Sequence, residues 1–439
     1  MFDCLLLNAQ CFIEGELVYT DIALENGKIK KLGVLKNEKA TEVYDCKDMT
    51  IIPGVIDTQV HFREPGNTHK EDLASGSRAA ALGGVTSFFE MPNTNPSTTT
   101  KEAMEKKLAI ASEKSVVNYA FFIGATENNI EEIKSCQGMS GLCGVKIFLG
   151  SSTGSLLLND EKVILELFKN IPMMFSIHSE DEEIMKKNFS KLPTTPPVHL
   201  HSSWRSPESA LSSTKKIIAL AHKANKKIHV LHISTKEEVD FLIENKKVCT
   251  FEITPQHLHL HAPDCYERLG SFSQMNPPIR EMEHQKRLWE AVANNEVAIL
   301  GSDHAPHTVE EKKQPYPTSP SGIPGAQTIF PLMLNACMEN KISLNQLVNY
   351  FVKNPVEVFK IKNKGQIKKG FDGDLTIFSN RDFTIKNEDQ ASKCGWTPFD
   401  GKRLKGRVEM TVVGGKVVMR DNKIITREEL SSSAVEFHH

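Results

Sequence analysis

Apolar runs and helix-type segments alternate through the middle of the chain. Eight runs have the length and the β-branched or aromatic content of buried strands: Ile51–His61, Val85–Met91, Val116–Ile123, Gly144–Leu149, Met173–His178, Ile228–His232, Val248–Thr254 and Val297–Asp303. Helical patterns follow several of them: Glu71–Leu82, Lys101–Lys114, Asp160–Lys169, Ser206–Asn225, Lys236–Asn245 and Met282–Asn294. Eight strand-then-helix units predict an α/β fold, a parallel (β/α)8 TIM-type barrel. An open doubly wound sheet is the competing interpretation, but no G-x-G-x-x-G follows the first strand.

The two ends of the chain show short strands and tight turns instead. Asn26-Gly27 fits a hairpin turn near the start, and Gly414-Gly415 fits another inside the apolar run Arg407–Met419. We therefore expect a small β-sandwich module formed by both chain ends. By residue number, the expected division is 1–50 and 363–430 for the split module, 51–362 for the barrel and 431–439 for a tail that could derive from an expression tag.

Composition narrows the class of protein. The chain has 439 residues, enough for a barrel of about 250 residues and an accessory module. A formal net charge of −2 gives no basis for binding nucleic acid or a membrane surface. Nine cysteines without a CxxC pair are typical of a reducing compartment. Signal-peptide features and long apolar stretches are missing from the sequence, so we expect a cytoplasmic protein that acts on a small-molecule substrate.

Polar residues of ligand type stand at or just beyond the ends of the expected strands. They are His61, Asn93, Lys146, His178, His232 and Asp303. In a barrel the carboxyl ends of the strands form one face, and barrel enzymes carry their chemistry there. The sequence therefore predicts an active site built from these residues.

The histidines and the aspartate favour a metal. His178 and His232 each end an apolar strand and together could bind zinc, although either alone is more typical of a hydrogen-bonded core histidine. Asp303 could bind the metal and shuttle a proton from bound water. The competing interpretation of Asp303 is a helix cap, which Pro306 and the loop after it disfavour.

Lys146 and Arg63 suggest two further roles. Lys146 lies in an apolar strand, where a bare ammonium is costly. A lysine that loses its proton can react with CO2, and the carbamate formed is a carboxylate able to bridge two metals; a snorkelling lysine paired with an acid is the alternative. Gln59, His61 and Arg63 share one face of a strand, which would place an anion-binding guanidinium beside a metal ligand.

Motifs along nearly the whole chain resemble the dihydroorotase branch of the amidohydrolase superfamily. They are Pro53-Gly with Asp57-x-x-x-His61-Phe-Arg63-Glu-Pro-Gly, Met91-Pro-Asn93-Thr, Val145-Lys-Ile-Phe, Asn276-Pro-Pro-Ile-Arg280 and Asp303-His-Ala-Pro-His307. The resemblance implies a metal-dependent barrel with a split β module. It also implies the reversible conversion of N-carbamoyl-L-aspartate to (S)-dihydroorotate in pyrimidine synthesis, and a homodimer is compatible with it.

The resemblance also implies roles for individual residues. The metal ligands it implies are His61, a carboxylated Lys146, His178, His232 and Asp303. The substrate ligands are Arg63, Asn93 and His307 for the carboxylate and Asn276 for the pyrimidine ring. Opening a cyclic amide needs an activated water, a polarised carbonyl and a proton donor for the departing nitrogen, and a metal with Asp303 can supply these.

Two positions depart from the family pattern. Gln59 stands where the family usually has a metal-binding histidine, and Gln256 stands where many members have a second one. A neutral amide oxygen is a poorer zinc ligand than imidazole. We therefore expect one tightly held zinc and a second, weaker one.

Two other functions remain open from the sequence. One is a sister cyclic amidase that acts on hydantoins, dihydropyrimidines or allantoin, but these lack the carboxylate that Arg63 and Asn93 would hold. The other is a catalytically silent homologue associated with aspartate carbamoyltransferase, for which a broader loss of ligands is expected. The segment Thr308–Ala326, rich in Pro, Ser and Gly, is expected to be a loop over the site.

Overall fold

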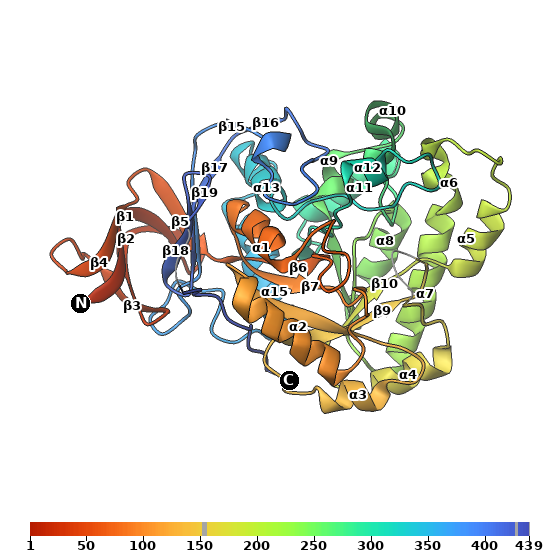
Figure 1. Ribbon diagram of the computed structural model, residues 1–439, viewed down its shortest axis with the longest axis horizontal. Coiled ribbons are helices and arrows are strands. Elements are labelled where there is room, and N and C mark those ends of the chain that lie inside the picture. Colours follow the sequence, from red (N-terminus) through yellow and green to blue (C-terminus); the bar gives the residue numbers. More distant parts are fainter. Residues whose placement is uncertain (152–155, 426–428, 439) are drawn as a thin grey trace.

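A barrel of eight parallel strands forms the centre of the computed structural model, which describes residues 1–151, 156–425 and 429–438 (Figure 1). The strands neighbour one another in chain order: β6 (Val55–Val60), β7 (Val85–Glu90), β8 (Asn118–Gly124), β9 (Leu142–Phe148), β10 (Phe175–His178), β11 (Ile228–Val230), β12 (Cys249–Ile253) and β13 (Ile299–Leu300). A bridge between Val60 and His304 joins the last strand segment to the first. The predicted (β/α)8 barrel is confirmed, and the doubly wound sheet is excluded.

Helices pack around the barrel as the hydrophobic pattern predicts. Those between the strands are α1 (Leu73–Leu82), α2 (Lys101–Lys114), α3 (Ile130–Ser135), α4 (Glu161–Asn170), α7 (Pro207–Ala224), α8 (Lys236–Glu244) and α11 (Met282–Ala293). After β13 come α13 (Ile329–Met338), α14 (Leu344–Val348), the π-helical turn Asn349–Lys353 and α15 (Asn354–Phe359). The six predicted helices begin and end within two residues of these bounds, since side chains such as Asp72 and Thr100 cap their first turns.

Shorter helices lie in the loops at the carboxyl ends of the strands. They are α5 (Glu182–Phe189), α6 (His201–Trp204) after the 3-10 turn Val198–Leu200, α9 (Pro255–His259), α10 (Asp264–Leu269) with the 3-10 turn Gly270–Ser273, and α12 (Val309–Lys312). The last of these corrects the expectation of a loop throughout Thr308–Ala326. Thr308, and not Asp303, caps α12, so Asp303 remains available for chemistry.

A second sheet combines strands from both ends of the chain (Figure 1, left). Its strands are β1 (Phe2–Ile13), β2 (Glu16–Glu25), β3 (Lys28–Gly33), β4 (Ala40–Asp45), β5 (Met49–Pro53), β14 (Leu375–Ser379), β17 (Arg407–Val413), β18 (Lys416–Arg420) and β19 (Lys423–Ile424). Its order is β19-β18-β17-β14-β5-β1-β2-β3, with β4 beside β1. A separate two-stranded sheet pairs β15 (Phe383–Thr384) with β16 (Arg403–Leu404). The predicted split module is thereby confirmed.

The expected single strand Ile51–His61 is two strands in the structure. β5 pairs with β1 and β14 in the small sheet, and β6 opens the barrel. Gly54 separates them where the chain passes close to Thr86, because a Cβ at this glycine would lie 2.2 Å from Thr86 Oγ1. The small sheet therefore extends three residues past the expected boundary at residue 50.

Both expected hairpin turns occur. Asn26 and Gly27 have φ of 52° and 75°, and Gly414 and Gly415 have φ of 53° and 76°. Two successive positive φ values are the mark of the type I′ turn that connects antiparallel strands tightly. These turns join β2 to β3 and β17 to β18.

The last residues pack under the barrel rather than projecting from it (Figure 1). Val435 N donates to Tyr119 O at 3.0 Å, and Gly141 N donates to Val435 O at 2.9 Å. The Phe437 ring lies edge-on to Phe89 with centroids 5.6 Å apart. Residues 431–438 thus belong structurally to the barrel.

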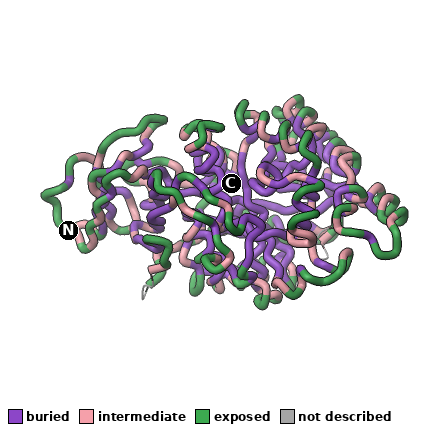
Figure 2. The backbone as a smooth tube through the Cα atoms, turned by 90° about the horizontal axis from the view of Figure 1, so that it is seen from above, coloured by how far each residue is buried: buried purple, intermediate pink, exposed green. Residues whose placement is uncertain are grey.

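Buried and exposed residues are distributed differently in the barrel and in the small module. The strands and inner helix faces of the barrel are buried almost continuously, whereas exposed positions gather on loops and on the outer strands of the small module (Figure 2). No helix in the described ranges is both long enough and apolar enough to cross a lipid bilayer.

Candidate active site

One cavity at the carboxyl ends of the strands collects nearly all the candidate residues. Its lining residues are Gln59, His61, Arg63, Asn93, Lys146, Phe148, His178, His232, Asn276, Asp303, Ala305, Ser321 and Gly322. The members of this set come from β6, β9, β10 and the loops after five strands, β6, β7, β11, β12 and β13. His307 is the one candidate that does not line the cavity.

His61 and Asp303 form the first pair of metal-ligand side chains. His61 Nδ1 donates to Asn93 Oδ1 at 2.8 Å, because an amide oxygen can only accept. In the neutral ring, Nε2 then carries a lone pair, and it lies 3.1 Å from Asp303 Oδ1. Burial lowers the pKa of His61, which favours that neutral form. Two facing acceptors of this kind suit a bound cation.

His178 and His232 form the second pair. His178 Nε2 donates to Glu180 Oε2 at 2.9 Å, which leaves Nδ1 as the lone-pair atom, 3.0 Å from His232 Nε2. Burial opposes the charge on Glu180, but Arg205, whose Nη2 lies 2.6 Å from Glu180 Oε2, and His178 lower its pKa overall. A carboxylate that fixes the tautomer of a histidine is a common support of metal sites.

Lys146 lines the same cavity as both pairs. Its side chain is buried, its Nζ has no hydrogen-bond partner among the described residues, and Nζ stands 4.6 Å from the centre of the Phe148 ring. Burial lowers the pKa of Lys146 to about 7, although Asp303 and Glu252 favour its charged form. A substantial fraction of this amine is therefore neutral near pH 7, the form that reacts with CO2.

The donor set fits a metal only if Lys146 contributes a ligand. Within residues 1–151, 156–425 and 429–438, no three His, Cys, Asp or Glu side chains converge as a preformed metal cluster. Instead there are two pairs with about 3 Å between their facing atoms, and the unpaired Lys146 amine lines the same cavity. A carboxylate on that amine would give each pair a third ligand.

Gln59 does not mimic a histidine ligand in this arrangement. Its Nε2 donates to Asp303 Oδ1 at 3.0 Å, and its Oε1 is buried without a hydrogen-bond partner among the described residues. Gln256 is buried outside the cavity lining, where its Nε2 donates to Ser302 O at 2.6 Å. Of the two departures from the family pattern, only Gln59 faces the site.

Arg63 is a buried guanidinium without an acidic partner among the residues that the structure describes. It is 3% exposed, its Nε donates to Pro306 O at 3.3 Å, and no carboxylate of the described chain lies within 4 Å of it. Burial lowers its pKa to about 10, so it remains charged near pH 7. An unpaired buried cation on a cavity wall is a receptor for an anionic group of a ligand.

His307 stands behind Arg63. Its Nε2 lies 3.3 Å from Arg63 Nη2 and 3.0 Å from Ser321 O, and the residue is fully buried. Burial lowers its pKa to about 3, which leaves the ring neutral. The structure thus places His307 where it can position Arg63.

Three site residues have left-handed backbone conformations. The φ angles are 65° at Arg63, 39° at His232 and 45° at Asp303. Such conformations cost about 1–3 kcal/mol each for residues with a Cβ and cluster at functional sites. They place three side chains from three different loops into the same cavity.

Sequence reasoning missed the residues that support the ligands. Glu180 lies two residues after His178, and that spacing could have indicated a supporting carboxylate. Arg205 and Ser321 carry no comparable signal, since each lies in an irregular segment far along the chain from the residue it supports.

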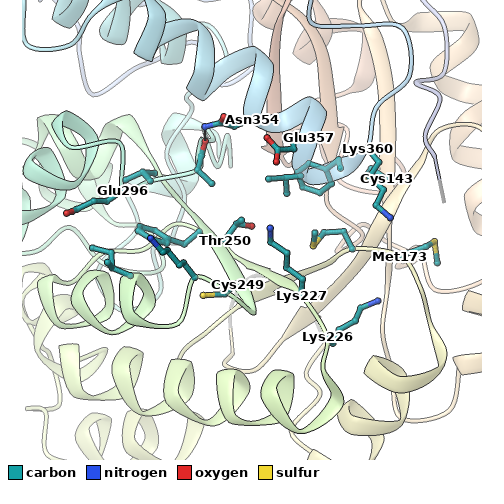
Figure 3. Close-up of a pocket in the computed structure, with 18 of the residues that line it drawn as sticks. Cys143, Met173, Lys226, Lys227, Cys249, Thr250, Glu296, Asn354, Glu357 and Lys360 are labelled. Carbon is teal, nitrogen blue, oxygen red and sulfur yellow. Dashed lines mark hydrogen bonds between the residues drawn. The ribbon is translucent and has the colours of Figure 1, made fainter.

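A cavity of about 790 Å³ at the opposite end of the barrel is not this site (Figure 3). Several of its lysines, such as Lys226, Lys246 and Lys360, follow the carboxyl ends of helices, where ammonium groups complement the helix dipole. It contains none of the candidate residues.

A (β/α)8 barrel whose strand ends carry two ligand pairs and a buried lysine is the architecture of a metal-dependent hydrolase. The chain belongs to the amidohydrolase family, whose model matches residues 50–418, and within that family it groups with the dihydroorotases. It is 34% identical to a dihydroorotase of Methanosarcina acetivorans, over 97% of this chain and 93% of the relative. It is 33% identical to one of Pyrococcus abyssi, over 96% of each.

Solved structures with the same architecture include a hydantoinase and a dihydropyrimidinase. L-Hydantoinase (dihydropyrimidinase) from Arthrobacter aurescens aligns with a TM-score of 0.93 at 26% identity, over 99% of this chain and 100% of that one. Dihydropyrimidinase from Brevibacillus agri aligns with a TM-score of 0.90 at 24% identity over the full length of both chains, a likeness that shows the fold alone.

Proposed function

We propose that the chain is a dihydroorotase, a hydrolase of cyclic amides that interconverts N-carbamoyl-L-aspartate and (S)-dihydroorotate. The observation that carries this proposal is Arg63, a buried cation without an acidic partner in the described chain, on the wall of the cavity that holds the ligand pairs. Dihydroorotate carries a carboxylate beside its ring, and a guanidinium can bind a carboxylate through two parallel hydrogen bonds.

Zinc is the metal that this donor set suits best. His61 and Asp303 would hold one ion, His178 and His232 a second, and a carbamate formed from Lys146 and CO2 would serve both. When bound, the metal polarises the amide carbonyl and makes water a nucleophile at neutral pH. The donor pairs and the lowered pKa of the buried Lys146 amine support this assignment.

The chain's own side chains provide substrate binding and proton transfer. Arg63 holds the carboxylate, with His307 packed behind it, and Asn93 orients His61 through its amide oxygen. Asp303 accepts a proton from the attacking water and returns it to the departing ring nitrogen. Asn276, which also lines the cavity, contacts the ring.

The two other functions are less well supported. Hydantoins and dihydropyrimidines, after which the structural relatives are named, lack the ring carboxylate and would leave Arg63 without an anion in a buried site. A catalytically silent homologue would not need the two ligand pairs, the buried, unpaired Lys146 amine and the supporting Glu180–Arg205 ion pair, all of which lie in the described chain.

The test is turnover by the purified, zinc-supplemented protein. Dihydroorotate ring opening and carbamoyl-aspartate cyclisation should both proceed. Hydantoin, dihydrouracil and allantoin should be turned over at least about 100-fold less efficiently, because they have no carboxylate for Arg63 to bind. Turnover of a carboxylate-free ring without turnover of dihydroorotate would assign the protein to the sister amidases. No turnover of any of the four rings, and no cyclisation of carbamoyl-aspartate, by the zinc-loaded protein would favour the silent homologue.

A cytoplasmic location belongs to the same proposal. All nine cysteines are free, and eight of them are buried, as is typical of a reducing compartment. We also propose a homodimer and an association with aspartate carbamoyltransferase. Gel filtration of the purified protein tests the first, and gel filtration of its mixture with that enzyme tests the second.

A further inference from the structure

A chain of four polar side chains leads from the segment over the site to a residue of the cavity wall. Trp204 Nε1 donates to Tyr316 Oη at 2.6 Å, and Tyr316 Oη lies 3.2 Å from His201 Nδ1. His201 Nε2 in turn lies 2.9 Å from Asn276 Oδ1 and 3.0 Å from the carbonyl oxygen of Met275. None of the first three residues lines the cavity, whereas Asn276 does.

The donor and acceptor groups of the four side chains fix the direction of each hydrogen bond between them. The carbonyl of Met275 can only accept, so His201 Nε2 must carry a proton. Burial lowers the pKa of His201 to about 3 and thereby keeps the ring neutral, so Nδ1 carries a lone pair. The Trp204 indole can only donate to Tyr316. The hydroxyl proton of Tyr316 is therefore available for His201 Nδ1.

The same reasoning fixes the orientation of Asn276. The amide atom that faces a protonated His201 Nε2 must be the oxygen, because an amide NH2 there would place two donors against each other. The amide nitrogen is then the atom left for the cavity. It has no hydrogen-bond partner among the described residues and can donate to a ligand.

We propose that His201, held by Tyr316 and Trp204, positions Asn276 so that its NH2 group selects a ring carrying a carbonyl oxygen on that side of the cavity. This rests on the proposed function, under which the ring is dihydroorotate. The scissile carbonyl faces the ligand pairs, so the acceptor that Asn276 contacts is the other carbonyl, at ring position 2. Tyr316 lies in the segment after α12. Selection of the ring therefore depends on the position of that segment relative to the cavity.

The experiment compares dihydroorotate with 2-thiodihydroorotate, whose sulfur is a weaker acceptor, as substrates of the zinc-loaded protein. The wild-type kcat/KM should be about tenfold lower for the thio compound, the effect of one weakened hydrogen bond. In His201→Phe the amide is no longer held in one orientation. The kcat/KM for dihydroorotate should then fall about tenfold, mainly through KM, and the preference for oxygen over sulfur should shrink to within about twofold.

Tyr316→Phe supplies a second variant, since it removes the hydroxyl that donates to His201 Nδ1 and accepts from Trp204 Nε1. It should lower the oxygen preference partially while leaving zinc content unchanged. Tyr266→Phe is the matched control, because it removes one hydrogen bond of the same kind, to Ile279 O at 3.2 Å, outside the four-residue chain, and it should keep the wild-type ratio.

The outcomes separate the two proposals. Wild-type protein that does not turn over dihydroorotate overturns the proposed function. Wild-type turnover with an unchanged oxygen-to-sulfur ratio in both His201→Phe and Tyr316→Phe overturns the positioning role alone. Should His201→Phe not fold, the ratio in Tyr316→Phe decides.

Discussion

At the scale of single residues, the site depends on atoms that the protein itself leaves unpaired. The buried Lys146 amine and Gln59 Oε1 have no hydrogen-bond partner, and Arg63 has no carboxylate partner, within the described chain. A buried polar atom without a partner costs about 1–3 kcal/mol. The two unpaired atoms and the guanidinium without a counter-charge are costly for the folded chain, and a carbamate, a metal and a substrate carboxylate would satisfy them.

Arg63→Ala tests the binding of the substrate carboxylate. Removing one partner of an ionic hydrogen-bonded pair in a buried site costs about 2–5 kcal/mol, so kcat/KM for dihydroorotate should fall about 100-fold or more while zinc content stays the same. Steady-state kinetics with elemental analysis measure both quantities. Arg78→Ala, on the exposed face of α1, should change neither, and a metal-depleted Arg63→Ala protein would contradict a role confined to substrate.

Gln59 predicts an uneven pair of metal sites. It donates to Asp303 and offers no imidazole, so the position of His61 and Asp303 lacks a ligand, whereas His178 and His232 are supported by Glu180. Elemental analysis after purification should find about one zinc, with a second bound only from added metal. Gln59→His should tighten the second site, and two zincs of equal resistance to a chelator in the unmodified protein would refute this expectation.

At the scale of elements, α2 supports the loop that carries Asn93 through a buried ion pair. Lys107 Nζ lies 3.0 Å from Glu90 Oε2 at the end of β7, both side chains are fully buried, and Nζ donates to Met91 O at 3.2 Å. Burial lowers the pKa of Lys107 and raises that of Glu90, although each favours the charge of the other. The pair thus ties the helix to the strand end next to Asn93.

Lys107→Met should lower the free energy of unfolding by about 3–5 kcal/mol, because it leaves Glu90 as an uncompensated buried charge. Adding Glu90→Gln should recover much of that loss. Denaturant unfolding of the single and double variants measures the difference. Lys106→Met, which breaks an exposed ion pair with Glu102 on the same helix, should cost at most about 1 kcal/mol. If the double variant is as unstable as Lys107→Met, the uncompensated charge of Glu90 is not the cause of the lost stability.

Elements also show what the sequence could predict. Repeating apolar strands and capped helices follow from local pattern, so the barrel, six helices and two hairpins could be predicted from the sequence. The ligand-type residues could be predicted because each lies near the carboxyl end of a strand or just beyond it. His201 and Arg205 could not, since their partners Asn276 and Glu180 are 75 and 25 residues away in the chain and meet them only after folding. The same holds for β5, whose apolar pattern continues into β6 although its hydrogen bonds belong to the other sheet.

At the scale of the whole molecule, the chain ends stabilise opposite parts of the barrel. The small sheet contacts the barrel through Thr376, whose hydroxyl donates to Gly84 O at 2.6 Å. A segment of the C-terminal region also reaches the catalytic end, where Trp396 Nε1 donates to His307 O at 2.8 Å. The accessory module therefore supports the backbone behind Arg63 as well as its own core.

The final residues form the remaining support, at the opposite end of the barrel. Phe437 is 4% exposed and packs against Phe89, while the neighbouring Glu436 is exposed. Phe437→Ala should lower the free energy of unfolding by about 3–5 kcal/mol, because it removes buried apolar surface and leaves a cavity behind. Glu436→Ala should change it by less than about 0.5 kcal/mol. Both should retain wild-type kcat in urea-free buffer, because the tail lies far from the catalytic face. Equal stability of the two variants in urea unfolding would show that residues 431–438 do not support the barrel in solution.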